Sequence, residues 1–573
     1  MDKFTFMIGG PAGAGILNTG LQLFAKTCLR NGLSVFTCAE YPSLIRGGHN
    51  HLAVSVSNDE IFSSSREINL LVALDKLTVD EHMEDVKGGV IYDSSSFTVD
   101  LPEDILSFPI PLKEISEKNG SVLYRNTVAI GAAFGLMGIP LKEMEKIIKD
   151  KFSKKGDEVV DGNIKSARDG WDFVLNKPFP FKLAVGDKDQ ILLNGNDAVV
   201  LGAIKAGCKF ISAYPMTPAT SVLTGMARYS RAKGIVVKHT EDEIASINMA
   251  IGAGFAGARA MTCTSGGGFA LMAEGLGLAA QTETPVVIVE SQRPGPGTGM
   301  ATRTGQGDLN FMLNASTDEF PRVVIAPGDV KECYYYIQQA FNIAEKYQMP
   351  VVLLLDKFLS TSCQSVVLDK DAGIQRGKIA DKLEKRYEIT QDGVSPRTLP
   401  GNPNGIFIAS SYEHNEHGVE DESRENRIKM HDKRYKKLET LAEELPEPKL
   451  FGDSDFIVIS WGSTKGIVRE ADKILKDDNS DFTHLFLPIL SPFPKKVFEK
   501  LKGKKLIVVE NNKTSQLSDL IAKETGRVVD HKILKYDGRQ FNPEDLSRAL
   551  REVMATGVKE VILSKRIMRR VGE

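Results

Sequence analysis

The sequence predicts a multi-domain α/β protein. Short apolar runs alternate with helical segments along most of the chain, as expected of strands that are joined by helices. Several runs, such as PVVIVES and MPVVLLLD, are continuous in valine, isoleucine and leucine, which is typical of parallel strands covered on both faces. The length of 573 residues provides enough chain for about three or four domains.

A first α/β unit is predicted over residues 1–183. Helical segments separate its strand-like runs, which are FTFMI, LSVFTCA, HLAVSVS, LLVAL and GGVIYD. This alternation predicts a largely parallel sheet. The unit is expected to end near NKPFPFK.

The N-terminal stretch FTFMIGGPAGAG predicts a strand, a glycine-rich turn and the start of a helix. Backbone amides and the positive end of a helix suit a pyrophosphate group. Glu40 ends the next strand, about where a dinucleotide-binding unit keeps its ribose-binding acid. However, Asn18 stands where the GxGxxG pattern requires its third glycine. Two interpretations remain open: a nicotinamide- or flavin-binding module of a dehydrogenase, and a tight strand-to-helix turn.

A second α/β unit is predicted over residues 184–370, which starts at ILLNGNDAVVLGAIKAG and continues through six strand-like runs. These strands are KFISAYP, GIVVKHT, ARAMTCTSGG, PVVIVES, RVVIAPG and MPVVLLLD. A third α/β unit is predicted over residues 451–573, from DFIVISWGSTKGIVREADKIL through HLFLPIL and KKLIVVENN to a final helix. Both units have the pattern of sheets covered by helices.

Residues 371–450 lack this alternation and are rich in charged residues and turn formers, which predicts a linker or an excursion over another surface. Within them, residues 421–438 alternate both charge signs and predict a solvated helix. His414 and His417 have a spacing found in metal sites, but no further ligands converge on them, so a charged loop is the better interpretation. No metal site is predicted in this chain.

Charge and cysteine content exclude several classes of protein. The formal net charge of -3 gives no reason to expect nucleic acid or an anionic membrane as a partner. No apolar run is long enough for a membrane span, and the N-terminus lacks a signal-peptide pattern, so a cytoplasmic location is expected. The six cysteines are scattered without any CxxC pair, which predicts buried single thiols and no iron–sulfur cluster in this chain.

Candidate site residues follow the strands of the second unit. Thr217 lies between two prolines in YPMTP, where it is expected at the carboxyl edge of the sheet, although Thr217 or Thr220 also suits a helix N-cap. Thr240 and Glu243 have the T-x-x-E spacing of a capping box.

Two further strand ends carry glycine-rich loops. SGGG at 265–268 follows one strand, and Arg293 and Arg303 lie in RPGPGTGMATRTGQGDL after the next. The strand ends together supply a hydroxyl, a carboxylate and guanidinium groups. Such a set suits a small carboxylic acid held beside a protonatable cofactor.

These motifs resemble the α subunit of 2-oxoacid:ferredoxin oxidoreductases, in the form with a γ domain fused at its N-terminus. GGPAGAG and YPSLIRGGHNH resemble the γ domain, the middle of the chain resembles the thiamine-pyrimidine domain, and WGSTKGIVREA with VVENNKTSQL resembles the transketolase-C-like domain. The segments SPRTLPG and YEHNEHG look most like the 2-oxoglutarate-type members. The resemblance implies coenzyme A-dependent oxidative decarboxylation of 2-oxoglutarate to succinyl-CoA, also in the reverse direction as CO2 fixation; pyruvate and branched-chain 2-oxoacids are the alternative substrates.

The resemblance also implies roles for individual residues. Glu243 corresponds to the glutamate that hydrogen-bonds the aminopyrimidine ring of thiamine diphosphate; Glu241, two residues away, fits the motif less well. Thr217 and Arg293 are implied to hold the substrate, and Arg303 is the second choice or a contact for a second carboxylate. The remaining implied contacts are Tyr214, Pro215, Gly266 and Gly267 for the cofactor and Gly13 and Arg46 for coenzyme A.

A partner is also implied by the resemblance. Mg²⁺ and a [4Fe-4S] cluster are expected on a β subunit, with ferredoxin as electron acceptor and an (αβ)2 assembly. This expectation agrees with the absence of clustered cysteines in the present chain.

Overall fold

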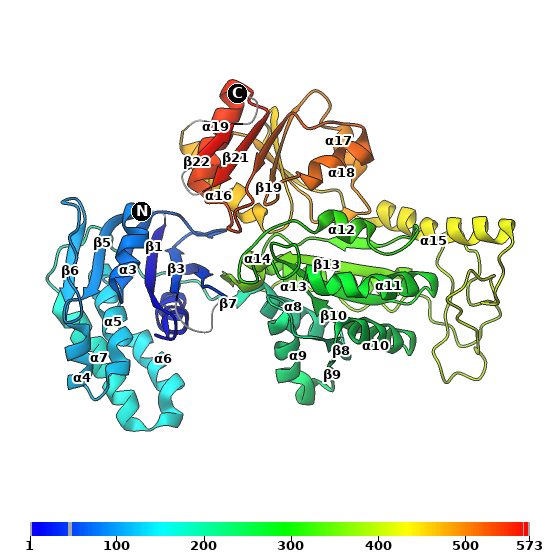
Figure 1. The fold of residues 1–573 in the computed structure, drawn as a ribbon. Helices are drawn as coiled ribbons and strands as arrows, with labels where there is room; N and C mark the ends of the chain where they lie inside the picture. The colour runs from blue at the N-terminus through cyan, green and yellow to red at the C-terminus, as the bar shows by residue number, and fades with distance from the viewer. Residues whose placement is uncertain (1–2, 44–47, 479, 565–566, 571–573) are drawn as a thin grey trace. The chain divides into compact units, whose positions relative to one another are not determined.

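The structure, a computed structural model, describes residues 3–43, 48–478, 480–564 and 567–570 (Figure 1). The chain forms two compact units. Unit 1 comprises residues 1–193, 361–367 and 542–544, and unit 2 comprises residues 194–360, 368–541 and 545–573. Both units are built of sheets with interleaved helices, which confirms the predicted α/β class.

Unit 1 contains one sheet with the strand order β6-β5-β4-β1-β3-β2-β14-β7. The strands are β1 (Phe4–Pro11), β2 (Ser34–Glu40), β3 (His49–Ser57), β4 (Ile68–Ala73), β5 (Val86–Asp93), β6 (Leu106–Ile110), β7 (Ile191–Asn194) and β14 (Cys363–Val366). The five predicted strand runs of this unit are confirmed. The strand β14 comes from a segment far along the chain and pairs with β2.

The prediction of a largely parallel sheet is wrong for half of this unit. β1, β4, β5 and β6 are parallel to one another, but β3 is antiparallel to both β1 and β2. The connection from Glu40 to His49 is too short for a parallel crossover, which needs about a dozen residues or more, so β2 and β3 pair as an antiparallel hairpin.

This topology also argues against a dinucleotide-binding module. In such a module the first two strands are parallel and lie side by side around the glycine turn. Here the neighbours of β1 are β3 and β4, and β2 lies beyond β3. Glu40 is therefore not on a strand adjacent to the turn, and FTFMIGGPAGAG is a strand-to-helix turn in which Gly13 and Gly15 have positive φ angles of 90° and 72°.

The two longest helices of unit 1 pack closely on each other. A Cβ on Gly131 would lie 2.0 Å from the carbonyl oxygen of Ala167, and one on Gly170 would lie 2.1 Å from that of Val128, so the two longest helices meet at their backbones. The helices are α1 (Ile16–Thr19), a π-helix (Gly20–Ala25), α2 (Lys26–Arg30), α3 (Lys76–His82), α4 (Leu112–Lys118), α5 (Arg125–Met137), α6 (Lys142–Phe152) and α7 (Asp157–Val174), with short 3₁₀ turns at Met83–Asp85, Val122–Tyr124 and Ser153–Lys155.

The first sheet of unit 2 has the order β18-β12-β13-β11-β10-β8-β9 and is parallel except for β18. Its strands are β8 (Phe210–Ala213), β9 (Val236–His239), β10 (Ala260–Thr264), β11 (Val286–Gln292), β12 (Val323–Ile325), β13 (Pro350–Asp356) and β18 (Ile489–Ser491). Its helices are α8 (Gly195–Lys205), α9 (Thr220–Lys233), α10 (Glu243–Phe255), α11 (Gly266–Gln281), α12 (Leu309–Asn314), α13 (Val330–Tyr347) and α14 (Lys357–Thr361). The six predicted strands are confirmed, and the continuous apolar runs are buried in the sheet centre.

The second sheet of unit 2 has the order β15-β17-β16-β19-β20-β21-β22. Its strands are β15 (Leu450–Phe451), β16 (Phe456–Ser460), β17 (Thr483–Phe486), β19 (Lys505–Glu510), β20 (His531–Leu534), β21 (Glu560–Ser564) and β22 (Ile567–Arg570), and its helices are α16 (Thr464–Asp477), α17 (Lys495–Glu499), α18 (Gln516–Thr525) and α19 (Pro543–Thr556). The predicted final helix is α19, but two strands follow it. Because β18 pairs with β12 and Trp461 is buried in a shared core, this sheet and the first form one body.

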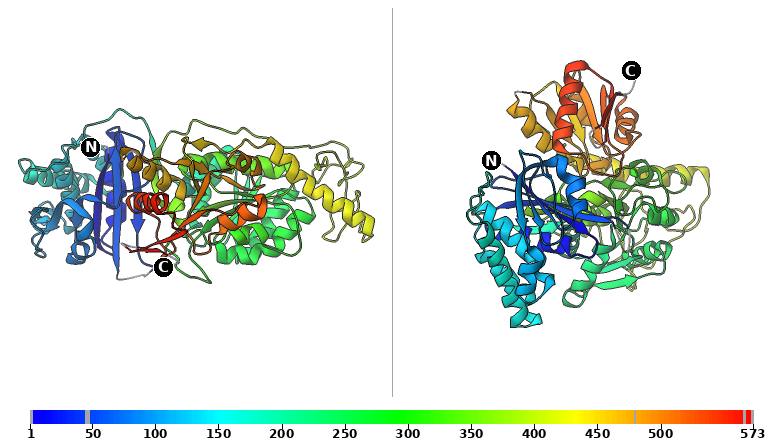
Figure 2. Two further views of the ribbon diagram at one scale, coloured as in Figure 1. Left: turned by 90° about the horizontal axis from the view of Figure 1, so that it is seen from above. Right: turned by 60° about the vertical axis from the view of Figure 1, so that its left-hand side comes forward.

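Residues 371–450 contact the ends of helices in unit 2: Arg376 donates to the carbonyl oxygen of Gly257 after α10, and Tyr387 donates to that of Thr282 after α11. They contain the long helix α15 (Arg424–Glu444), drawn in yellow in Figure 2. The prediction of a solvated helix is wrong for one face of α15. Lys433 and Lys437 are buried and form ion pairs with Glu283, with Lys433 Nζ 2.6 Å from Glu283 Oε1. Charge alternation alone does not show that a buried carboxylate, distant in sequence, faces the lysines.

Candidate active site

The candidate site residues lie at the carboxyl edge of the parallel sheet in unit 2. β13, β11, β10 and β8 are consecutive neighbours in this sheet. Thr217 follows β8, Gly266 and Gly267 follow β10, and Arg293 follows β11. The carboxyl ends of parallel strands form the usual ligand-binding edge of open α/β sheets.

Glu243 is the first residue of α10, directly after β9. The predicted capping box is wrong, because Asp242 caps this helix: its Oδ1 accepts a hydrogen bond of 2.8 Å from the amide of Ala245. The Thr240 hydroxyl instead lies 2.9 Å from the carbonyl oxygen of Asp242, to which it can donate, and 2.6 Å from the Ser246 hydroxyl, with which it can form a hydrogen bond in either direction. The helix begins too late for Glu243 to reach back to Thr240, so the carboxylate of Glu243 has no capping role.

The Glu243 carboxylate is buried without a complete set of partners. Glu243 is only 3% exposed, and its Oε1 accepts no hydrogen bond within the described part of the chain. Burial raises the pKa of Glu243 above the usual value for a glutamate. Buried polar atoms are nearly always paired, so an unpaired carboxylate oxygen at this edge indicates a ligand with a hydrogen-bond donor.

Glycines of α11 provide the space around this carboxylate. A Cβ on Gly268 would lie 2.4 Å from Glu243 Oε1 and 2.2 Å from Thr264 Oγ1, so only glycine fits at this position. A Cβ on Gly266 would lie 2.5 Å from Asp308 Oδ2, whereas Gly267 is exposed. Carboxylates from two different elements therefore approach the first turn of α11.

The structure brings together two of the predicted substrate residues. Arg293 Nη1 donates a hydrogen bond of 2.7 Å to the backbone carbonyl of Thr217, while the Thr217 residue itself is exposed. Tyr214 is 39% exposed on the same loop, beside the half-buried Pro215. The N-cap predicted as an alternative for Thr217 or Thr220 is not formed, because Ala219 occupies the cap position of α9.

Arg303 lies ten positions beyond Arg293 on the same glycine-rich segment and is half-buried. A Cβ added to Gly538 would lie 3.3 Å from the Cβ of Arg303, which places this arginine beside the second sheet of unit 2. Burial lowers the pKa of Arg293, and the charge of Glu290 opposes this shift. The two arginines thus lie in different surroundings.

Three carboxylates near this edge were not predicted as site residues. Glu290 and Asp356 lie at the ends of β11 and β13, and Asp308 precedes α12. Glu290 is fully buried, and neither of its carboxylate oxygens has a hydrogen-bond partner among the described residues. Burial, together with the nearby Asp308 and Asp356, raises its pKa well above the usual value. Two of these carboxylates could have been found from the sequence, because Glu290 and Asp356 end the continuous apolar runs VVIVES and VVLLLD.

Replacing Asp308 with asparagine is expected to stabilise the protein at neutral and alkaline pH but not at acidic pH. Burial raises the pKa of Asp308 from 3.8 to about 6, so the folded state binds this proton more tightly than the unfolded state. The carboxylate therefore destabilises the fold progressively as the pH rises from about 4 to 6, by up to about 3 kcal/mol. Thermal unfolding should show the variant more stable than the wild type at pH 8 and nearly equal at pH 4. Equal gains in stability at pH 4 and pH 8 would show that the raised pKa of Asp308 is not the cause.

The histidines of the charged segment do not form a metal site. His414 is fully buried, its two ring nitrogens lie 3.1 Å and 3.2 Å from the carbonyl oxygens of Asn415 and Gln281, and its ring packs 4.0 Å from that of Tyr387. His417 is exposed. The pair thus belongs to the packing of residues 371–450.

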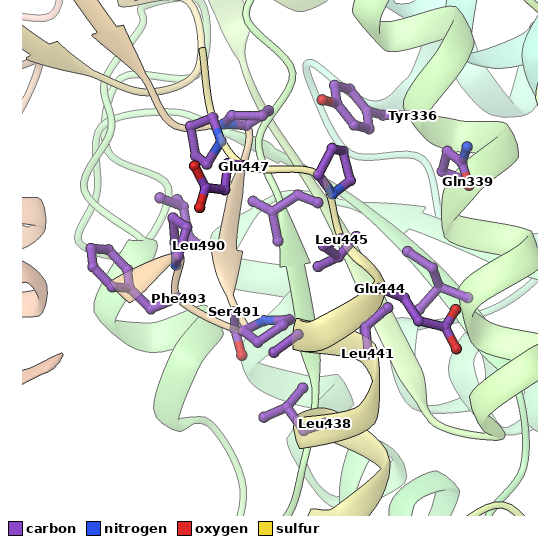
Figure 3. Close-up of a pocket in the computed structure, with 18 of the residues that line it drawn as sticks. Tyr336, Gln339, Leu438, Leu441, Glu444, Leu445, Glu447, Leu490, Ser491 and Phe493 are labelled. Atoms are coloured by element: carbon purple, nitrogen blue, oxygen red, sulfur yellow. The ribbon is translucent and has the colours of Figure 1, made fainter. Parts of the chain in front are cut away.

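The predicted coenzyme A contacts are in unit 1. Gly13 is exposed, and a Cβ there would meet no atom within 4 Å. Arg46 lies outside the described residues. A large cavity of about 1250 Å³ in unit 2 is lined by α13, the end of α15 and the loop around β18 (Figure 3). None of the candidate site residues lines it.

Two family models match most of the chain. One, described as "Pyruvate flavodoxin/ferredoxin oxidoreductase, thiamine diP-bdg", matches residues 201–433, which contain the candidate site. The other, described as "Pyruvate ferredoxin/flavodoxin oxidoreductase", matches residues 5–173 in unit 1. Among the described residues, no helix has the length and apolar character needed to cross a membrane.

Relatives match over nearly the whole length. The 2-oxoacid:ferredoxin oxidoreductase subunit alpha of Sulfolobus sp. is 35% identical over 98% of this chain and 99% of its own. The 2-oxoglutarate synthase subunit KorA of Methanocaldococcus jannaschii is 34% identical over 62% of this chain and 98% of its own. The solved structure of 2-oxoglutarate:ferredoxin oxidoreductase from Magnetococcus marinus, with 2-oxoglutarate, coenzyme A and succinyl-CoA bound, is 34% identical with a TM-score of 0.92 over 96% of this chain and 99% of that chain. The motif resemblance is thereby confirmed: this oxidoreductase chain belongs to the family of 2-oxoacid:ferredoxin oxidoreductase α subunits.

Proposed function

We propose that this α subunit acts on 2-oxoglutarate, which it converts with coenzyme A to succinyl-CoA and CO2 while electrons pass to ferredoxin. The relatives named for 2-oxoglutarate and the substrate bound in the Magnetococcus marinus enzyme support this substrate. The single observation that carries the chemistry is the buried Glu243 carboxylate, whose Oε1 has no hydrogen-bond partner among the described residues. The same residues serve the reverse reaction, which fixes CO2.

The site residues fit the pyrimidine half of thiamine diphosphate. The chemistry supplied by this cofactor when bound is stabilisation of the electron pair that decarboxylation leaves. Glu243 would hold a proton at a pyrimidine ring nitrogen, a role that suits a buried carboxyl group with a raised pKa. Tyr214, Pro215 and the first turn of α11 at Gly266 and Gly267 would border the ring.

Arg293 and Thr217 would bind the 2-oxoacid. One N–H group of Arg293 already holds the loop through the Thr217 carbonyl, which leaves other guanidinium donors for a carboxylate. The exposed hydroxyl of Thr217 can donate to the carboxylate or the keto oxygen. Arg303 would then face the second carboxylate of a dicarboxylic substrate.

Catalysis by this chain would require a β subunit that carries Mg²⁺ and a [4Fe-4S] cluster, in an (αβ)2 assembly with ferredoxin as acceptor. The subunit name of the relatives supports the need for a partner. Coenzyme A would contact the exposed turn at Gly13. The six free cysteines agree with a cytoplasmic location, where thiols stay reduced.

The substrate is tested with the chain purified together with its β partner. Turnover of 2-oxoglutarate, pyruvate and branched-chain 2-oxoacids is measured with coenzyme A and a viologen acceptor, and kcat/KM is expected to be highest for 2-oxoglutarate. A strong preference for pyruvate would overturn the substrate but not the roles of Glu243 and Thr217.

An Arg303→Met variant sharpens this test. Loss of a charge-assisted hydrogen bond should lower kcat/KM for 2-oxoglutarate by about 10- to 100-fold, with little change for pyruvate, which has no second carboxylate. Arg231→Met, at an exposed position of α9, is the matched control. Equal losses for both substrates would assign Arg303 to the carboxylate that they share.

A further inference from the structure

Three histidines gather in unit 1, outside the residues proposed for catalysis. His49 and His51 alternate on β3 and so share one face of the sheet, and His82 ends α3. One ring nitrogen from each of the three lies within 4.8 Å of the others, and the Nε2 atoms of His49 and His82 are 2.8 Å apart. The ring centroids are separated by 5.5 Å, 5.0 Å and 4.5 Å, so the rings surround one small volume.

The surrounding fold makes room for this cluster. His49 and His51 pair with Pro11 and Gly9 of β1, and a Cβ on Gly9 would lie 2.9 Å from His49 Cε1 and 2.7 Å from Thr78 Cγ2. α3 can therefore approach β1 only because position 9 is glycine. Asp75 caps this helix by accepting from the Thr78 amide at 2.9 Å, which places the start of α3 against the glycine.

A hydrogen bond between two neutral imidazoles accounts for the short distance between His49 and His82, but it uses only one donor and one acceptor. It does not account for His49 Nδ1, which is buried and has no hydrogen-bond partner among the described residues. Burial lowers the pKa of His49 and so favours the neutral ring. The negative charges of Asp75, Glu81 and Glu40 oppose this shift without reversing it. With its proton on Nδ1, His49 presents an unprotonated Nε2 toward His82, which is the form in which imidazole binds a metal; the ion would replace the hydrogen bond between the two rings.

We propose that His49, His51 and His82 bind a divalent cation of the zinc class in unit 1. Three imidazoles with no thiolate suit Zn²⁺, Ni²⁺ or Cu²⁺ better than Mg²⁺ or Ca²⁺, which prefer oxygen ligands. At Zn–N distances of about 2.0–2.1 Å, tetrahedral ligand nitrogens lie about 3.3 Å apart. The Nε2 atoms of His49 and His82 are 2.8 Å apart and the ligand nitrogens of all three histidines lie within 4.8 Å of one another, so the rings are close enough to share one ion. The acidic side chains near His49 would attract the positive charge of the bound cation.

The test uses the untagged full-length chain after removal of metal with a chelator. Co²⁺ is titrated as a spectroscopic probe and then displaced with Zn²⁺ in the presence of a chromophoric chelator. We expect one equivalent of Co²⁺ with the visible absorption of a low-coordinate site, stoichiometric displacement by Zn²⁺, and a rise in the melting temperature of the chain with added Zn²⁺.

Variants locate the site. His82→Gln and His51→Gln should each weaken Zn²⁺ binding by at least about 10-fold, since even loss of an outer-shell partner has that effect. His417→Gln, at an exposed histidine in unit 2, should bind as the wild type does. Sub-stoichiometric binding, or unchanged binding by a folded His82→Gln chain, would overturn the proposal and leave a hydrogen-bonded histidine cluster. Because the readout is metal binding, failure here leaves the proposed reaction untouched.

Discussion

Replacing Glu243 with glutamine is expected to lower turnover of the assembled enzyme by about 10²–10⁴-fold, the usual contribution of a positioned proton-transferring group. Glutamine keeps the size of the side chain but cannot share a proton with a ring nitrogen as a carboxyl group does. The Glu243 carboxylate is buried, and its Oε1 has no hydrogen-bond partner among the described residues, so its substitution breaks no observed bond of that oxygen. The fold and the assembly should therefore remain intact.

Glu241 provides the matched control for this variant. It lies two residues away in the same acidic run but is exposed, so Glu241→Gln should retain near-normal turnover. Initial rates with 2-oxoglutarate, together with size-exclusion chromatography of both complexes, measure activity and assembly separately. Near-normal turnover of Glu243→Gln in an intact complex would remove Glu243 from the proposed mechanism.

Replacing Glu283 with glutamine is expected to lower the free energy of unfolding by about 3–5 kcal/mol, because removal of one partner leaves buried charges unpaired. Glu283 faces both Lys433 and Lys437, whose side chains are buried with it. Although burial raises the pKa of Glu283, the two lysines and Arg386 outweigh it and hold the pKa below the usual value. The carboxylate thus stays ionised and balances the ammonium groups.

The loss of stability should depend on pH. Burial already lowers the pKa of Lys437 from 10.5 to about 7, and without Glu283 both lysines would lose their protons on folding. Burying the lysines in their neutral form lowers the free energy of unfolding more as the pH falls further below the pKa of lysine in the unfolded chain. The Glu283→Gln variant should therefore be destabilised more at pH 6 than at pH 9. Chemical denaturation of wild type and variant at both pH values measures this difference.

An exposed ion pair on the same helix serves as the control. Lys436 and Glu439 lie 3.0 Å apart but are 44% and 66% exposed, and such pairs contribute about 0–1 kcal/mol. Glu439→Gln should therefore change stability little. Similar small losses for Glu283→Gln and Glu439→Gln would show that α15 does not depend on its buried charges.

The strands and the main motifs could be predicted because their signals are local. A continuous apolar run such as VVLLLD identifies a buried parallel strand, and YPMTP, SGGG and the RPGPGTGMATRTGQGDL loop each lie at a strand end that the sequence already marks. The order of these motifs was enough to place the chain in its family. Thr217 and Arg293 follow β8 and β11, which are separated by β10, and their proximity agrees with the rule that the parallel strands of one sheet end at one edge.

Features that depend on contacts between distant residues could not be predicted. Three such features are the pairing of β14 with β2, the burial of Lys433 against Glu283 and the contact of His82 with His49. Each joins segments whose separation along the chain carries no periodic signal. The antiparallel β3 is different, because its short connection to β2 is a local signal that was missed. The capping of α10 by Asp242 was missed because two acceptors near one helix start have similar local propensity, and tertiary packing chooses between them.

By itself, the sequence determined the α/β class, the strand runs, the family and the candidate residues Thr217, Glu243 and Arg293, because hydrophobic period and motif order are properties of short stretches of chain. Only the tertiary structure decided which buried carboxylates have oxygens with no hydrogen-bond partner among the described residues, which lysines are paired in the interior and which histidines lie together. Desolvation and ion pairing depend on the full surroundings of each group, and those surroundings exist only once the chain has folded.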